Sequence, residues 1–220
     1  MINRIKSLLL LSLVPALMSV SLTAYAGGDK ITEGMIEYSV DASTMDPQLA
    51  PFLENMALTF YFTSNKVRVE TEMGAMGTTT VISNGDNTVT LMNMMGNKIA
   101  MTESMEEPDA EVNVEYMDET KTILGYECRK AVISAGGMDM TYWVTDKIQM
   151  PKVESNMLVD ELNGHPLQME INLGMAAVTM TATNVTKKKI DADRFDTAVP
   201  EGYEIMTAQE MMQLMGGMGQ

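Results

Sequence analysis

The strongest constraint on the fold is that apolar and polar residues alternate along most of the chain, in short segments separated by turn residues. Ile36, Tyr38 and Val40, for example, share one side of a segment whose other side is polar. The segments with this pattern are 35–41, 57–63, 66–73, 78–82, 88–94, 98–102, 112–116, 126–134, 138–145, 167–173 and 176–186. Period-two alternation over so many segments predicts a mainly β protein with one antiparallel sheet, packed on one face and wetter on the other.

Helix signals are few. Asp46-Pro47 is a typical start, because proline suits the first helical position, and Leu49, Phe52, Leu53 and Met56 follow at helical spacing. Thr207 and Glu210 have the spacing of a capping box, in which each side chain bonds to the backbone N–H of the other residue. We therefore expect two or three short helices beside the sheet.

The first 26 residues have the order of a secretory signal peptide. Arg4 and Lys6 precede an apolar run, and Ala24-Tyr25-Ala26 is a small-residue cleavage site. The expected organisation is a signal peptide at 1–26, a β domain at 27–206 and a methionine-rich helix or tail at 207–220. Cleavage would change the net charge from −15 to −17.

This charge and composition exclude several classes of protein. The acidity argues against binding to nucleic acid or anionic membranes. No later apolar run approaches the ~20 residues that span a bilayer, and 45% hydrophobic residues is too many for a disordered chain. No cysteine follows the cleavage site as a lipid anchor. We expect a soluble protein of the periplasm, or a secreted one.

The residues that usually carry catalysis are scarce. Cys128 is the only cysteine, and we expect a small buried hydrophobe. His165 is the only histidine, and its Asn163-Gly164-His165-Pro166 context predicts an exposed loop. No nucleophile elbow, phosphate loop or zinc-binding helix motif occurs. We therefore predict no catalytic residue, no cofactor and no enzymatic activity.

Methionine and tryptophan offer two candidate sites. The chain has 25 methionines, and thioethers are both flexible fillers and soft ligands for Cu(I). The strand pattern places pairs of them on one face, and the candidate metal ligands are Met92, Met94, Met138 and Met140. Trp143 faces away from Met140 and Tyr142 on its strand, toward either a ligand or a covering helix.

Several local patterns resemble an uncharacterised family of exported bacterial proteins. They are the stretch Lys121–Ala131, read as one strand with a Gly-Tyr-x-Cys centre, then Tyr142–Ile148, Asn163–Glu170 and Val199–Tyr203. The first two are also similar to the GLPGLI family, whose own motif is absent here. The resemblance implies a fold like the lipoprotein carriers LolA and LolB, an incomplete antiparallel barrel with helices against its concave side.

The resemblance favours an exported, non-enzymatic envelope protein that binds or carries a lipid or another apolar ligand. The candidate lining residues are Phe60, Phe62, Leu91, Met140, Tyr142, Trp143, Met169 and Ile171. Flexible methionines suit a pocket that accepts variable chains. Two alternatives stay open: an envelope protein that binds a protein partner through a sheet edge or its tail, and a methionine-rich Cu(I)-binding protein.

Overall fold

Twelve strands of the computed structural model form one sheet, and the described residues are 29–41, 56–102, 112–136, 138–151, 161–172, 177–207 and 209–211. The strands of the first half are β1 (Gly34–Asp41), β2 (Met56–Phe62), β3 (Val67–Met73), β4 (Gly77–Ser83), β5 (Thr88–Met94) and β6 (Asn97–Met101). Those of the second half are β7 (Asn113–Ile123), β8 (Tyr126–Ala135), β9 (Met138–Thr145), β10 (His165–Asn172), β11 (Ala177–Thr186) and β12 (Glu204–Ile205).

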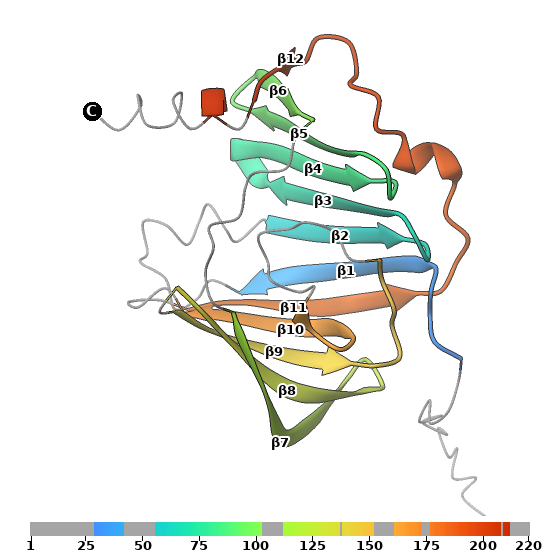
Figure 1. The fold of residues 1–220 in the computed structure, drawn as a ribbon, viewed down its shortest axis with the longest axis vertical. Coiled ribbons are helices and arrows are strands. Elements are labelled where there is room, and N and C mark those ends of the chain that lie inside the picture. Colours follow the sequence, from blue (N-terminus) through green and yellow to red (C-terminus); the bar gives the residue numbers. More distant parts are fainter. Residues whose placement is uncertain are drawn as a thin grey trace, which may run out of the picture.

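Two antiparallel meanders meet in the middle of this sheet (Figure 1). The first runs outward from β1 to β6, and the second runs inward from β7 to β11, where β11 pairs with β1. Only β12 is parallel to its neighbour, β6. The sheet is open, with β12 and β7 as its edges. The expected mainly β fold with one antiparallel-dominated sheet and few helices is therefore confirmed.

One expected strand is a hairpin. We took Lys121–Ala131 as a single strand, but β7 ends at Ile123, and Leu124 and Gly125 make the turn to β8. Both turn residues have positive φ, 50° and 83°, which is the geometry of tight two-residue hairpin turns. Glycine adopts this conformation freely and leucine rarely does, so the Leu-Gly pair is hard to recognise as a turn.

The two faces of the sheet carry separate hydrophobic clusters. We call the first the core face; it carries Tyr38, Phe60 and Tyr142 in the main cluster. The opposite face packs in the other half of the sheet, where Ile82 and Leu91 contact residues that follow β11. The expectation of a single packed face is therefore wrong. Alternation identifies the two faces of a strand, but both faces are buried in different parts of this sheet.

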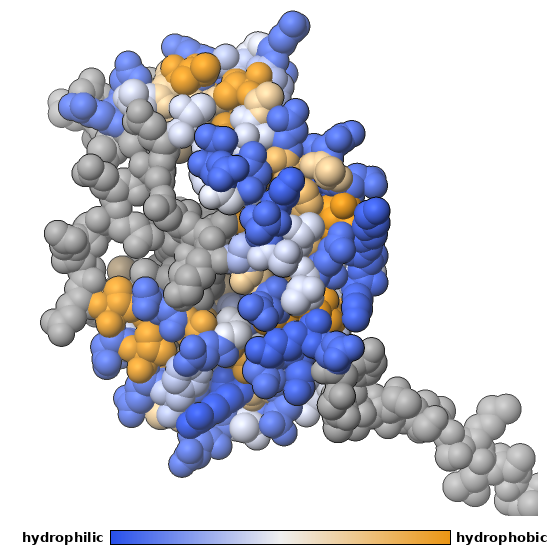
Figure 2. Space-filling view, turned by 45° about the vertical axis from the view of Figure 1, so that its right-hand side comes forward, coloured by the Kyte–Doolittle hydropathy of each residue, from blue (hydrophilic) through white to orange (hydrophobic). Residues whose placement is uncertain are grey.

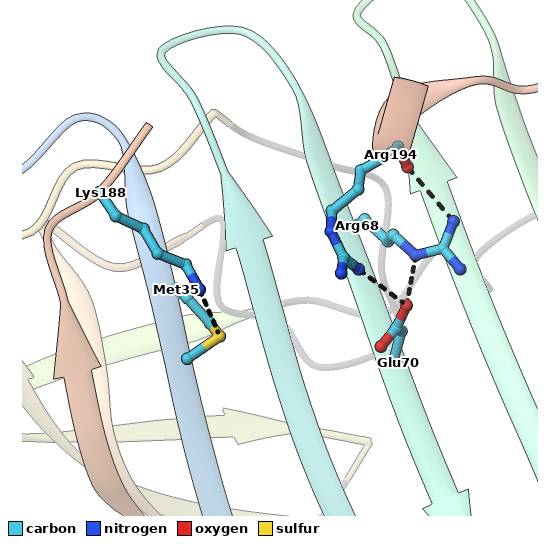
Figure 3. A network of polar contacts seen from close by, with 5 residues as sticks. All are labelled: Met35, Arg68, Glu70, Lys188 and Arg194. Atoms are coloured by element: carbon cyan, nitrogen blue, oxygen red, sulfur yellow. Dashed lines mark hydrogen bonds and ion pairs between the residues drawn. The ribbon is translucent and has the colours of Figure 1, made fainter. Parts of the chain in front are cut away.

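The second cluster is closed by a segment we call the strap, residues 187–207, and the face it covers is the strap face. Ile190 and Phe195, which lies in the short helix η3 (Ala192–Phe195), are buried there. Figure 3 shows how charged groups fasten the strap: Arg194 lies 3.7 Å from Glu70, and Arg68 donates to the Arg194 carbonyl at 3.2 Å. Glycine- and charge-rich as it looks in sequence, this segment is part of the fold.

Only part of the expected helical structure falls in the described residues. The capping box is confirmed, because Glu210 N–H donates to Thr207 Oγ1 at 3.2 Å and Thr207 N–H donates to Glu210 Oε2 at 2.8 Å. The helix expected after Asp46 and the signal peptide lie outside the described residues, although Met56 begins β2 instead of continuing a helix. Within the part described, no helix is long and apolar enough to cross a bilayer.

Candidate functional site

The core face is closed at one end of the strands and open at the other. We name the ends by their residues: His165 begins β10 at the histidine end, and Met94 and Met138 lie at the methionine end, on the left in Figure 1. On β1, Ile36 near the histidine end is fully buried, whereas Val40 is half-buried. On β9, exposure rises from 1% at Tyr142 to 54% at Met138.

The same gradient recurs along the other strands of the core face. Its half-buried apolar residues toward the methionine end are Val40, Val69, Val114, Met140 and Ile171. Segments that lead into or out of the strands close the histidine end, where Ile31 and Ile148 form a parallel bridge and Leu162 is buried. The core face therefore has a deep apolar floor that becomes accessible at one end only.

A buried polar pair stands within the closed part. Tyr38 donates its hydroxyl hydrogen to the Pro166 carbonyl at 2.7 Å, and the same oxygen lies 2.6 Å from His165 Nε2. Because the tyrosine has one hydrogen to donate, its oxygen accepts from His165, which places the imidazole proton on Nε2. The Phe60 ring packs edge-on against both rings, at 5.5 and 5.6 Å.

Burial fixes the charge of this pair. Desolvation lowers the pKa of His165 to about 3, so the imidazole is neutral at pH 7, and it raises the pKa of Tyr38 well above its usual value. The expectation of an exposed loop histidine is therefore wrong. Gly164 does make the turn, with φ 130°, but the next residue is inside the core and bonded to Tyr38, 127 residues away in sequence.

Trp143 lies on the opposite side of β9 from Tyr142, as its position in the alternation predicts. Lys121 Nζ stands 3.9 Å from the centre of the indole ring and donates to the Gln168 side chain. Desolvation lowers the pKa of Lys121. The indole Nε1 is buried and has no hydrogen-bond partner among the described residues. The ring is thus capped by a lysine, which leaves little room for a ligand over it.

The remaining candidate lining residues divide between the two faces. Phe60, Phe62, Tyr142 and Met169 belong to the main cluster and are almost fully buried, with Met140 and Ile171 half-buried against it. Leu91 packs in the other cluster, on the strap face. The structure thus brings together six of the candidates on the core face and places Leu91 and Trp143 elsewhere.

The four candidate metal ligands do not come together. Met92 and Met94 are on β5, and Met138 and Met140 are on β9, with six strands between them in the sheet. Tyr142 donates its hydroxyl to Met140 Sδ at 3.5 Å. Among the described residues, no three His, Cys, Asp or Glu side chains form a group that could hold a metal ion. Cys128 is buried, as expected, and burial raises its pKa to about 11.

A polar cleft of about 290 Å³ opens at the histidine end, and sequence reasoning missed it. Its lining residues are Tyr116, Glu127, Arg129, Val144, Asp146 and Asn163. Arg129 lies over the Tyr116 ring at 5.5 Å, and Tyr116 Oη accepts from the Asn163 N–H at 2.6 Å. These residues are up to 47 positions apart in sequence, so only the pairing of β7, β8 and β9 assembles them.

The exposed surface adds no wide apolar area in the view of Figure 2. Hydrophilic residues cover most of the described surface there, and hydrophobic ones form small, separate patches. The large apolar side chains that are most exposed lie at turns or strand ends: Met94, Met95, Leu124, Met138 and Ile205. The gradient along the core face and the polar cleft are therefore the two features with the geometry of a site.

Comparison with known proteins gives a consistent answer on fold. The structure is similar to two solved structures described as PNGF-II in the C2 and P21 space groups, with TM-scores of 0.54 and 0.56 and identities of 17% and 16%. Each match covers 83% of this chain and only 32% or 33% of the other, so the chain spans about a third of the length of those proteins. No curated protein matches significantly.

A family comparison covers most of the domain. Residues 52–207, more than two thirds of the chain, match the model of the family described as N-glycanase peptide, N-terminal domain. The matched range begins just before β2 and ends after β12, so it includes every strand except β1. The chain belongs to the N-glycanase N-terminal domain family.

Proposed function

We propose that this chain is an exported, non-catalytic binding protein that holds an apolar ligand, such as an acyl chain, against the core face. The observation that carries the proposal is the gradient of exposure along the strands. A sealed apolar floor with one accessible end is a shape that admits an elongated apolar molecule end-on. The proposal includes the carrier-like fold and the periplasmic location that the sequence led us to expect.

The chemistry of the open end suits such a ligand. Met140 and Ile171 are directly opposite each other on β9 and β10, and both are half-buried beside the floor residues Tyr142 and Met169. Methionine has three rotatable bonds, so it can adapt to chains of different length and shape. A ligand there would cover apolar surface at roughly 25 cal/mol per Å².

A fluorescent fatty acid with a C16 chain tests the proposal by titration into detergent-free protein. We expect saturable binding, and we expect Ile171→Glu to abolish it, because a carboxylate at the opening must be desolvated by the incoming chain. Ile205→Glu is the matched control, since Ile205 is 62% exposed on β12 and far from the core face. Absence of saturable binding, or equal loss in both variants, would contradict the proposal.

The polar cleft supports a second candidate, a carbohydrate ligand. The family is named for an N-glycanase, and an aromatic ring beside an arginine, two carboxylates and an amide is a donor and acceptor set that suits a sugar. A panel of released N-glycans tests this by calorimetry. Asp146→Asn should weaken binding if the cleft holds a sugar, whereas Asp86→Asn, in the turn before β5, should not.

A further inference from the structure

We propose that Met56, Met73 and Met94 form a Cu(I) site at the methionine end of the sheet. The site is independent of the apolar-ligand proposal and is different from the four methionines considered from the sequence. Its basis is the register of four neighbouring strands. Met56 on β2 is directly opposite Met73 on β3, and Met94 on β5 is directly opposite Gly77 on β4.

The three thioethers lie on one face of the sheet. Met56 has the parity of Phe60 on β2, and Phe60 pairs with Val69, which has the parity of Met73 on β3. Pairing across β4 extends this face to β5: Thr71 pairs with Thr79, and Thr79 pairs with Met92, two residues from Met94. The three methionines therefore share the core face at its accessible end.

Glycine leaves the space between them open. The β3 and β5 backbones are separated by β4 and thus by roughly 10 Å, and the β4 residue at this level is Gly77, which has no side chain. A Cβ there would lie 1.9 Å from the Asn93 carbonyl oxygen, so the backbone packing requires glycine. Directly opposite pairs such as Met56 and Met73 have Cβ atoms about 5 Å apart. Flexible side chains can close such gaps around one ion.

The surroundings select a soft ion. Thioether sulfur is a soft ligand that favours Cu(I), whereas carboxylates and carbonyls favour Mg²⁺ or Ca²⁺. The row is also unlike the methionines that only fill the core: Met101 and Met169 are 3% and 1% exposed, whereas Met56 and Met73 are half-buried and Met94 is 41% exposed. Sulfur atoms at the row are therefore within reach of an ion from solvent.

Anaerobic Cu(I) titration in competition with bicinchoninate, a coloured Cu(I) chelator, tests the proposal. We expect one copper ion retained per chain. Met73→Leu, which conserves volume and should fold, should weaken retention by more than about tenfold, the lower range of what loss of even an outer-sphere partner costs a metal site. Met94→Leu should do the same. Since a thioether carries no proton to lose, affinity should be unchanged between pH 7 and pH 5.

Two matched controls make the result specific. The double variant Met138→Leu/Met140→Leu removes two thioethers from the same end of the sheet but from β9, and Cys128→Ala removes the other soft ligand; both should retain copper as the wild type does. Circular dichroism checks that each variant is folded. Complete transfer of copper to the chelator, undiminished retention by Met73→Leu, loss of copper from either folded control, or a fall in affinity at pH 5 would each overturn the proposal.

Discussion

The two ends of the core face differ in packing, polarity and access. At the histidine end, apolar side chains are sealed by segments that lead into and out of the strands, and the buried Tyr38–His165 pair lies among them. At the methionine end, the same face has half-buried residues and exposed thioethers such as Met94 and Met138. The difference separates two tasks: one end maintains the fold, and the other is free to bind.

The largest expected difference between the ends is in stability, and β2 provides a matched pair. Phe62→Ala at the histidine end should lower the free energy of unfolding by about 3–5 kcal/mol, because the ring is fully buried and its loss leaves a cavity. Met56→Ala, on the same face of the same strand, should cost about 1 kcal/mol. Urea denaturation measures both, and equal losses would remove the distinction between the ends.

The closed end should also make stability depend on pH. His165 has a folded pKa of about 3, below its unfolded value of 6.5, so the unfolded chain binds more protons between these values. Its contribution is fully present above pH 6.5 and is lost as the pH falls toward 3, by an amount on the order of a few kcal/mol. The measurement is the unfolding free energy from pH 7 to pH 4.

The control for this pH dependence is His165→Gln. Carboxylates titrate over the same range in both proteins, so the difference between the two curves isolates the histidine. We expect the wild type to lose more stability than the variant as the pH falls. Parallel curves would show that the imidazole is solvated in the folded protein.

Removal of one hydroxyl tests the hydrogen bonds of the pair. Tyr38→Phe leaves the His165 N–H and the Pro166 carbonyl without their partner inside the core, which should cost about 1–3 kcal/mol. Tyr203→Phe, on the strap, is the control, since that ring is only half-buried and contacts Lys98 through its face. A change at Tyr38 no larger than the control would mean that water replaces the hydroxyl.

The sequence predicts the strands far better than it predicts what they bring together. Alternation locates β1 and β11 because each carries the pattern within itself, but their pairing at the centre of the sheet joins residues about 140 positions apart. The same limit explains the errors at the site. Leu91 was grouped with Phe60 because both alternate, and nothing local states that β5 packs its other face under the strap.

The candidate site shows the same division between local and distant information. Asn-Gly-His-Pro is a turn signal, and Gly164 is in the turn, but His165 is drawn into the core by Tyr38 on a distant strand. Likewise, clusters in the sequence suggested Met92 with Met94 and Met138 with Met140. The register instead sets Met94 level with Met73 and Met56, which are separated from it in sequence by turns.

The smallest expected effect on stability comes from oxidation of the open end. Hydrogen peroxide converts a thioether to a sulfoxide with release of water, and exposed methionines react first. Met95 is 89% exposed and Met138 is 54% exposed, whereas Met169 is 1% exposed. Peptide mapping after brief peroxide treatment should find sulfoxide at Met95 and Met138 before Met169, with unfolding free energy changed by no more than about 0.5 kcal/mol, as for surface substitutions. Early oxidation of Met169 would instead mean that the opening extends into the floor of the core face, and the accessible end would then reach much deeper than Met140.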